Sequence, residues 1–165
     1  MPAPSPITPA GPMSLPLSRL KTLLSASTSF QTWVGKTSAA DALAFIFLVA
    51  TRTTTRPLAV IGQGEKWELA KIAEVAFQTS GSLLILFEDN TNSTYLDPAY
   101  NADAELDFMN KVGNCCKDMA VLAGTSGYLS ALSFSLMDGP RRTDENERKT
   151  EGDLYQAVIR VEYGI

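Results

Sequence analysis

Two stretches near the C-terminus, Tyr128–Asp138 (YLSALSFSLMD) and Asp153–Gly164 (DLYQAVIRVEYG), decide the fold. In both, apolar residues recur at every second position. These positions are Leu132, Phe134 and Leu136 in the first stretch and Tyr155, Ala157, Ile159, Val161 and Tyr163 in the second. A period of two with β-branched and aromatic residues on one face is what a half-buried strand needs. The pattern therefore predicts two strands.

The segment between these strands, Gly139–Gly152, contains no large apolar residue and is rich in charge. A loop much longer than a hairpin requires is usually functional or disordered. Mixed charges suit ion pairs between identical copies, where they set specificity more than affinity. We predict that this loop projects from the sheet and contacts a neighbouring subunit or a partner protein; the alternative is a solvated loop. Its candidate contact residues are Arg141, Arg142, Asp144, Glu145, Glu147, Arg148, Lys149 and Glu151.

Composition limits the function classes. The chain has 165 residues, 45% apolar and 19% charged, which suits an ordinary globular domain. Its net charge of −4 argues against a general nucleic-acid binder, which usually has a basic surface. The chain has no histidine, the commonest general base and a common metal ligand. Without a catalytic or metal-binding motif, we expect no enzymatic activity, no cofactor and no metal.

The two cysteines, Cys115 and Cys116, are adjacent. Neighbours on a helix point about 100° apart, so these two are poor partners for each other. They also lack the spacing of a zinc site. We interpret them as small, reduced residues in or near the core.

The N-terminal part divides into an arm and the start of a domain. Residues 1–12 contain five prolines, which remove backbone donors, so we expect them outside the compact core, extended over a neighbour or mobile. Residues 13–165 are predicted to form a single α+β domain. Ser14 is a candidate cap for a leucine-rich helix. Ala39–Ala50 is predicted to be a helix that runs into a buried strand.

The middle of the chain predicts a second pair of strands. Pro57 opens a strand at Leu58–Ile61, and Gly62–Gly64 is interpreted as a turn. A further strand around Trp67–Phe77 is predicted to reverse at Gln78–Gly81 and return through Leu83–Glu88. The returning strand is apolar at both parities before Glu88, which is typical of a central strand covered on two sides.

A long helix follows, capped by Asn101 or Asp103 and ended by Gly124. Its predicted buried stripe is Phe108, Met109, Val112, Cys116, Met119, Ala120 and Ala123. Gly113 in mid-helix suggests close packing at that position. The order of elements predicts an α+β fold: a largely antiparallel sheet, two main helices packed on one face and a long charged loop between the last two strands.

Short segments between Met13 and Ile165 resemble small proteins of tailed bacteriophages. They are Phe30–Gly35 (FQTWVG), Arg56–Ile61 (RPLAVI), Ser80–Leu83 (SGSL), Gly152–Ala157 (GDLYQA) and Arg160–Gly164 (RVEYG). The order of elements is similar to that of the tail terminator proteins of long-tailed phages. These motifs are short, so no individual binding residue is carried over from the family.

The resemblance implies an α+β subunit that forms a ring of six, caps the tail tube and joins the tail to the head connector. The implied partners are other copies of the chain, the tail tube protein and the connector or stopper protein, with genomic DNA only as cargo passing through the ring. The implied location is the tail or neck of the virion, assembled in the host cytoplasm, with no membrane partner. Two alternatives are a stopper protein of the same neck and a small non-viral ligand-binding domain with a deep apolar pocket.

Overall fold

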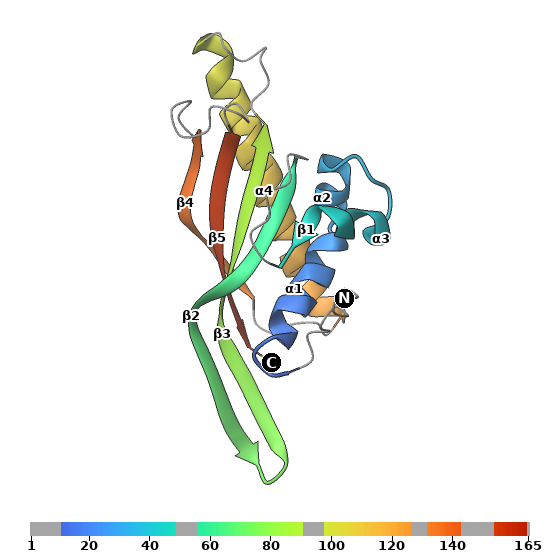
Figure 1. Cartoon of the computed structure of the whole chain (residues 1–165), viewed down its shortest axis with the longest axis vertical. Helices are drawn as coiled ribbons and strands as arrows, with labels where there is room; N and C mark the ends of the chain where they lie inside the picture. The colour runs from blue at the N-terminus through green and yellow to red at the C-terminus, as the bar shows by residue number, and fades with distance from the viewer. Residues whose placement is uncertain (1–10, 49–55, 91–97, 127–131, 143–153, 165) are drawn as a thin grey trace, which may run out of the picture.

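The computed structural model describes residues 11–48, 56–90, 98–126, 132–142 and 154–164, which form a five-stranded sheet with helices packed on one face (Figure 1). The helices are α1 (Leu15–Ser25), α2 (Thr28–Trp33), α3 (Ala39–Ala42), the 3-10 helix η1 (Leu43–Phe45) and α4 (Pro98–Ser126). The strands are β1 (Ile46–Phe47), β2 (Leu58–Ala73), β3 (Ala76–Asn90), β4 (Ser133–Arg142) and β5 (Leu154–Gly164). Their order is β1-β2-β3-β5-β4; β1 is parallel to β2 and the other neighbours are antiparallel. The predicted α+β class is therefore confirmed.

The short helices begin at serine caps. Ser27 accepts a hydrogen bond from the backbone N–H of Phe30 at 3.2 Å, and Ser38 accepts one from Asp41 at 3.2 Å. Such caps satisfy backbone donors that a first helical turn leaves free. Ser14 stands at the start of α1 as predicted, but its hydroxyl donates to the carbonyl oxygen of Gly11 at 3.4 Å and does not cap the helix.

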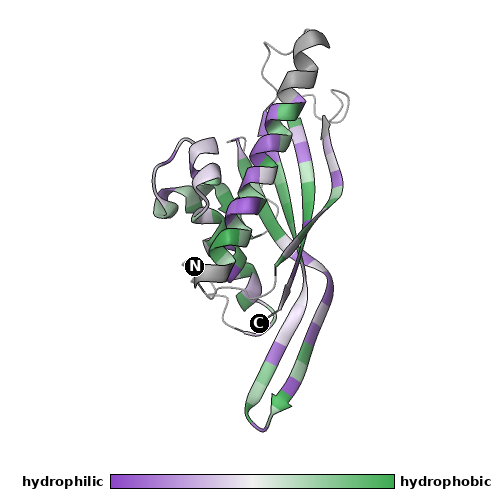
Figure 2. Cartoon of the chain, turned by 180° about the vertical axis from the view of Figure 1, so that it is seen from behind, coloured by the Kyte–Doolittle hydropathy of each residue, from purple (hydrophilic) through white to green (hydrophobic). Residues whose placement is uncertain are grey.

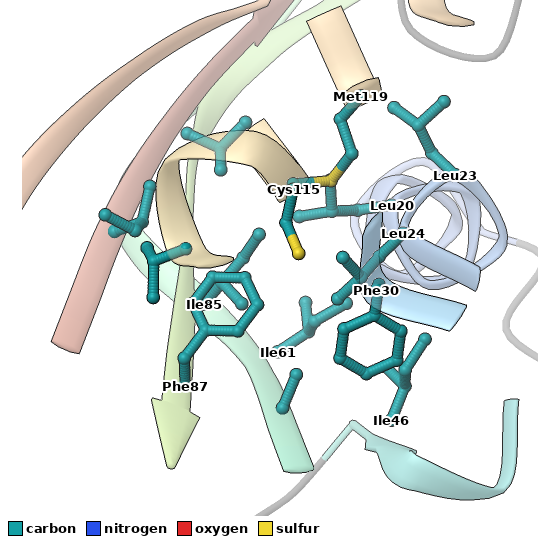
Figure 3. Packing of buried hydrophobic residues seen from close by; sticks show 14 of the residues in the cluster. Leu20, Leu23, Leu24, Phe30, Ile46, Ile61, Ile85, Phe87, Cys115 and Met119 are labelled. Carbon is teal, nitrogen blue, oxygen red and sulfur yellow. The ribbon is translucent and has the colours of Figure 1, made fainter. Parts of the chain in front are cut away.

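The core lies between the helices and one face of the sheet (Figure 3). Its largest fully buried side chains include Leu20, Leu23, Leu24, Phe30, Ile61, Ile85, Phe87 and Met119. Trp33 of α2 stacks on Phe87 of β3 at 5.8 Å between ring centroids, and its indole N–H donates to Asp89 at 2.8 Å. The indole therefore has both an apolar contact and a polar partner, as a buried tryptophan requires.

The central strand is β3, as the sequence predicts, but helices cover only one of its faces. Leu83, Ile85 and Phe87 point into the core and are fully buried, whereas Leu84 and Leu86 on the other face are half-buried. The prediction that this strand is covered on two sides is therefore wrong for the described residues.

The hairpin formed by β2 and β3 differs most from expectation. Both predicted turns, at Gly62–Gly64 and at Gln78–Gly81, lie inside strands. The chain reverses at Glu74–Val75, and the resulting hairpin extends beyond the rest of the sheet (Figure 1). β3 pairs with β5 only from Ser80 onwards. We call residues 67–79, which extend past that pairing, the hairpin arm.

The glycines near the root of the arm allow two strands to approach each other closely. The pairing of β2 with β3 shifts register between Gln63 and Trp67, and Gly64 and Gly81 lie at this irregularity. A Cβ at Gly64 would overlap Ser82, and one at Gly81 would overlap the backbone of Lys66. Glycine within a strand often marks such a bulge or close approach. The need for two strands to approach closely explains why glycines typical of a turn occur where the chain continues as a strand.

Gly81→Ala should lower the free energy of unfolding by about 1–3 kcal/mol, because the added methyl group meets backbone atoms that must shift. One of these, the Cα of Trp67, lies 3.1 Å from the position of the new Cβ. Urea denaturation measures the effect. Gly62→Ala is the matched control in the same hairpin, since nothing lies within 4 Å of a Cβ there. If Gly81→Ala and Gly62→Ala lowered the free energy of unfolding equally, the steric explanation would be contradicted.

The buried stripe of α4 is rotated relative to the prediction. Phe108, Val112, Cys115, Met119 and Ala123 are buried. Met109 is 43% exposed, Ala120 is exposed and Cys116 is half-buried. Gly113 is also exposed, with no atom within 4 Å of a Cβ built there, so the predicted close packing at Gly113 is wrong. The sequence pattern misled because α4 has apolar residues on its outward side too.

Candidate functional site: the assembly surfaces

The charged segment predicted to make contacts begins later than expected. β4 continues through Gly139 and Pro140 to Arg142, and the backbones of Arg141 and Arg142 pair with Gln156 and Tyr155 of β5. The prediction that these two arginines belong to the loop is therefore wrong, because strand pairing tolerates the two register shifts around Asp138. The other six candidates lie outside the described residues: Asp144, Glu145, Glu147, Arg148, Lys149 and Glu151. Residues 1–10 of the proline-rich arm also lie outside them.

The hairpin arm carries the largest group of exposed apolar side chains in the described part of the chain. Leu69 is 45% exposed, Ile72 64%, Val75 92% and Phe77 59%. Figure 2 shows apolar positions continuing along the hairpin after it has passed the helices. Large exposed apolar groups gathered on one element indicate a contact site.

The apolar residues of the arm are organised by strand register. Leu69 pairs with Thr79, and Lys71 pairs with Phe77. Directly opposed residues share a face, and so do residues two apart, so Leu69, Lys71 and Phe77 lie on one face of the arm. Gln78 lies on the opposite face, paired with Ala70. At the root, the indole N–H of Trp67 donates to the carbonyl oxygen of Pro12 at 3.3 Å, which attaches the start of the described chain to the hairpin.

A second exposed surface runs along the outward side of α4. Leu106 is 55% exposed, Met109 43% and Val121 63%. Helical spacing aligns Leu106 and Met109 with the exposed Gly113 and Ala120, because residues three, four, seven and eleven apart share one side of a helix. Val121, 15 residues after Leu106, lies about 60° further round the helix, at the edge of this side. We call Leu106, Met109, Gly113, Ala120 and Val121 the outward stripe of α4.

Both outer edges of the sheet also offer unpaired backbone. β1 pairs only with Ala59 and Val60, so from Ile61 to Ala73 the outer edge of β2 has no strand partner among the described residues. β4 forms the other edge, and it is interrupted by two register shifts and by Pro140. Bulges and proline are features that discourage pairing along an edge. The edge of β2 has two register shifts as well, but from Leu58 to Ala73 it contains no proline; Glu65, Lys66, Glu68 and Lys71 place charge along it.

A buried polar network lies on the sheet face opposite the helices. The guanidinium Nε of Arg56 donates to Glu88 at 3.1 Å, and the amide of Gln156 donates to the other carboxylate oxygen at 2.7 Å. The side chains of Arg56 and Glu88 are only 4% and 7% exposed. This network joins β5 and the central strand β3 to Arg56, two residues before the start of β2. We interpret its role as architectural, because the charges of Arg56 and Glu88 are paired with each other and both side chains are almost fully buried.

A second polar cluster attaches α2 to α4. One carboxylate oxygen of Asp118 accepts hydrogen bonds from the Ser27 hydroxyl at 2.8 Å, the Ser29 backbone N–H at 2.9 Å and the Thr28 hydroxyl at 3.4 Å. Burial alone would raise the pKa of Asp118, but these hydrogen bonds outweigh it and lower that pKa. The carboxylate thus stabilises the start of α2 and fixes it against α4.

Asp118→Ala should lower the free energy of unfolding by about 1–2 kcal/mol at neutral pH, as the loss of a helix cap does. Because the folded pKa is depressed, the stabilising effect is present above the unfolded value near pH 4 and is lost as the pH falls through the folded pKa. Urea denaturation from pH 7 to pH 2 tests this. Asp118→Asn keeps one acceptor oxygen, so it should lower the free energy of unfolding by less than Asp118→Ala does. The stabilities of the wild type and the Asn variant should become equal in acid, where Asp118 is protonated. If the difference in free energy of unfolding between wild type and Asp118→Asn stayed constant from pH 7 to pH 2, the ionised carboxylate of Asp118 would not be the stabilising group.

Both cysteines are free, with Cys115 buried and Cys116 half-buried, as the sequence predicts. Burial raises the pKa of the Cys115 thiol above its usual range and that of Cys116 to about 12. Both thiols therefore stay protonated at neutral pH and are poor nucleophiles.

No family model matches the chain, and no curated protein matches it either. Within the described ranges, no helix is long and apolar enough to span a bilayer. The same residues contain no group of three Cys, Asp or Glu side chains that could hold a metal ion. The surface features above are therefore the observations on which a functional conclusion rests.

Sequence reasoning missed the arm and the outward stripe of α4. A signal for the arm was present in the apolar residues between Trp67 and Phe77, but Gly62 and Gly64 before it and Gly81 after it led to turns being predicted at the wrong positions. A signal for the stripe was present as well, because Met109 and Ala120 extend the apolar pattern of α4 beyond a single face.

Proposed function

We propose that this chain is a structural subunit of the neck of a long-tailed bacteriophage, a tail terminator that forms a ring on the tail tube and joins the tail to the head connector. The observation that carries the proposal is the hairpin arm, which leaves four large apolar side chains 45–92% exposed. These apolar side chains are removed from water only when a partner protein covers them. The resemblance in short segments and the α+β fold agree with this assignment.

Ring formation also fits the shape of the subunit. The arm extends away from the helices, and the outward stripe of α4 lies on the helical layer, so the two surfaces are different parts of the molecule (Figures 1 and 2). Contact between unlike surfaces is heterologous, and heterologous contacts close into rings or continue into filaments. A ring of six is the stoichiometry that the family resemblance implies. The charged residues of the predicted loop Gly139–Gly152 remain a predicted contact to the tail tube or a neighbouring subunit.

Two measurements test the function. Light scattering at micromolar concentrations should give the mass of a closed oligomer, most simply six subunits. Electron microscopy of the chain mixed with tail tubes of the same phage should show a ring at one tube end. Heads and tails that join normally in particles lacking this chain would overturn the proposal. A ring located one layer above the tube, against the connector, would instead identify a stopper protein.

A further inference from the structure

The hairpin arm and the outward stripe of α4 have matching lengths. The β2 half of the arm, from Trp67 to Ala73, spans roughly 20 Å at the rise of a strand. The stripe, from Leu106 to Val121, spans about 22 Å at the rise of a helix. An extended hairpin can therefore contact the whole stripe at once.

We propose that the arm of one copy lies along the outward stripe of α4 in the next copy. The inference rests on the proposed ring and specifies its subunit contact. The face of the arm that carries Leu69 and Phe77 packs on Leu106, Met109 and Val121. Gly113 and Ala120 provide the room, because small side chains on a helix let another backbone approach closely.

Charge also favours this pairing. Lys71 lies among the apolar residues of the arm face. On α4, the acidic side chains of Glu105 and Asp107 flank Leu106 on either side, and the Asp107 side chain is 58% exposed even though it pairs with Lys111. Placing Lys71 near Leu106 brings opposite charges together at the rim of the contact. Rim pairs of this kind favour one register over others more than they add affinity.

β4 is a poorer partner for the arm. Its exposed apolar residues are Leu136 and Met137, at 55% and 48%. Neighbouring residues of a strand point to opposite faces, so these two do not form one surface. By contrast, Leu106 and Met109 of α4 share one side of the helix, and Leu69 and Phe77 share one face of the arm.

Photo-crosslinking tests the contact in the full chain. A benzoylphenylalanine placed at Phe77 in an unlabelled chain, mixed with an equal amount of ¹⁵N-labelled chain at about 50 μM, should crosslink between copies to peptides from residues 106–121. The same group at Gln78, on the opposite face of the arm, should give few such products. Intermolecular products that map to another element would overturn the inference and leave the ring intact. A chain that stays monomeric and forms no intermolecular products would overturn the inference and also count against the ring.

A substitution on the receiving side gives an independent result. Gly113→Arg adds a large side chain where, apart from the adjoining residues and backbone of α4, no atom of the subunit lies within 4 Å of the new Cβ, so the fold should remain at least as stable. It should raise the dissociation constant for self-association at least tenfold, measured by analytical ultracentrifugation. Thr32→Arg, at an exposed position of α2, is the control and should change it less than twofold. Unchanged self-association in Gly113→Arg would overturn the proposal.

Discussion

Glu88→Ala should lower the free energy of unfolding by about 3–5 kcal/mol, the usual result of removing one partner from a buried ion pair. The Arg56 guanidinium lies 3.1 Å from this carboxylate, and both side chains are almost fully buried. Without Glu88, the positive charge and the Gln156 amide lose the acceptor that they share. Urea denaturation followed by circular dichroism measures the loss.

Two further variants separate burial from charge. Glu162→Ala removes an ion pair on the same sheet face, the contact of Glu162 with Arg160 at 3.4 Å, but the Glu162 side chain is 55% exposed. An exposed pair contributes about 0–1 kcal/mol, so this loss should be small. The double variant Arg56→Met with Glu88→Leu should recover most of the stability, because apolar replacements leave no buried charge. If Glu88→Ala lowered the free energy of unfolding by no more than Glu162→Ala, the buried network would stabilise the fold no more than an exposed ion pair does.

The sequence predicts the class of the fold because its strongest signals are local. The period of two in Tyr155–Tyr163 follows directly from a strand with one face in the core, and β5 is buried at those positions. The leucines of α1 and the start of β2 at Leu58 were found for the same reason. Such patterns depend only on which face of an element meets the core.

The features missed depend on contacts between distant segments. Gly64 and Gly81 predict turns when taken alone, and only the pairing of β2 with β3 reveals that they allow a close approach of two backbones. Likewise, Phe108 and Met109 are equally apolar neighbours, and packing against Trp33 decides that Phe108 is buried. The exposed surfaces were missed because the sequence alone does not distinguish an apolar residue buried in the subunit core from an apolar residue exposed at a contact surface.

Removing the hairpin arm should abolish self-association while the subunit stays folded. Glu68 and Ser80 are directly opposed in the hairpin, so replacing residues 69–79 by Asn-Gly closes it with a two-residue turn. In the deleted segment only Thr79 is buried, and the cluster that forms the core contains none of its residues. The free energy of unfolding should therefore change by about 1 kcal/mol or less. Light scattering should detect a monomer where the full chain forms a closed oligomer.

A milder variant distinguishes the apolar face from the arm as a whole. Leu69→Ser with Phe77→Ser keeps the hairpin length and removes the two large apolar side chains from one face; Gln78→Ser changes the other face and is the control. Burying a leucine or phenylalanine contributes about 1.5–3 kcal/mol each, so the double variant should weaken each subunit contact by at least tenfold. A shortened arm that still gave the full oligomer would show that the subunits meet elsewhere, through the sheet edges or the segment 143–153. If the shortened arm gave a monomer but the double serine variant assembled normally, the backbone edge of β2 would provide the contact, and the apolar face would not.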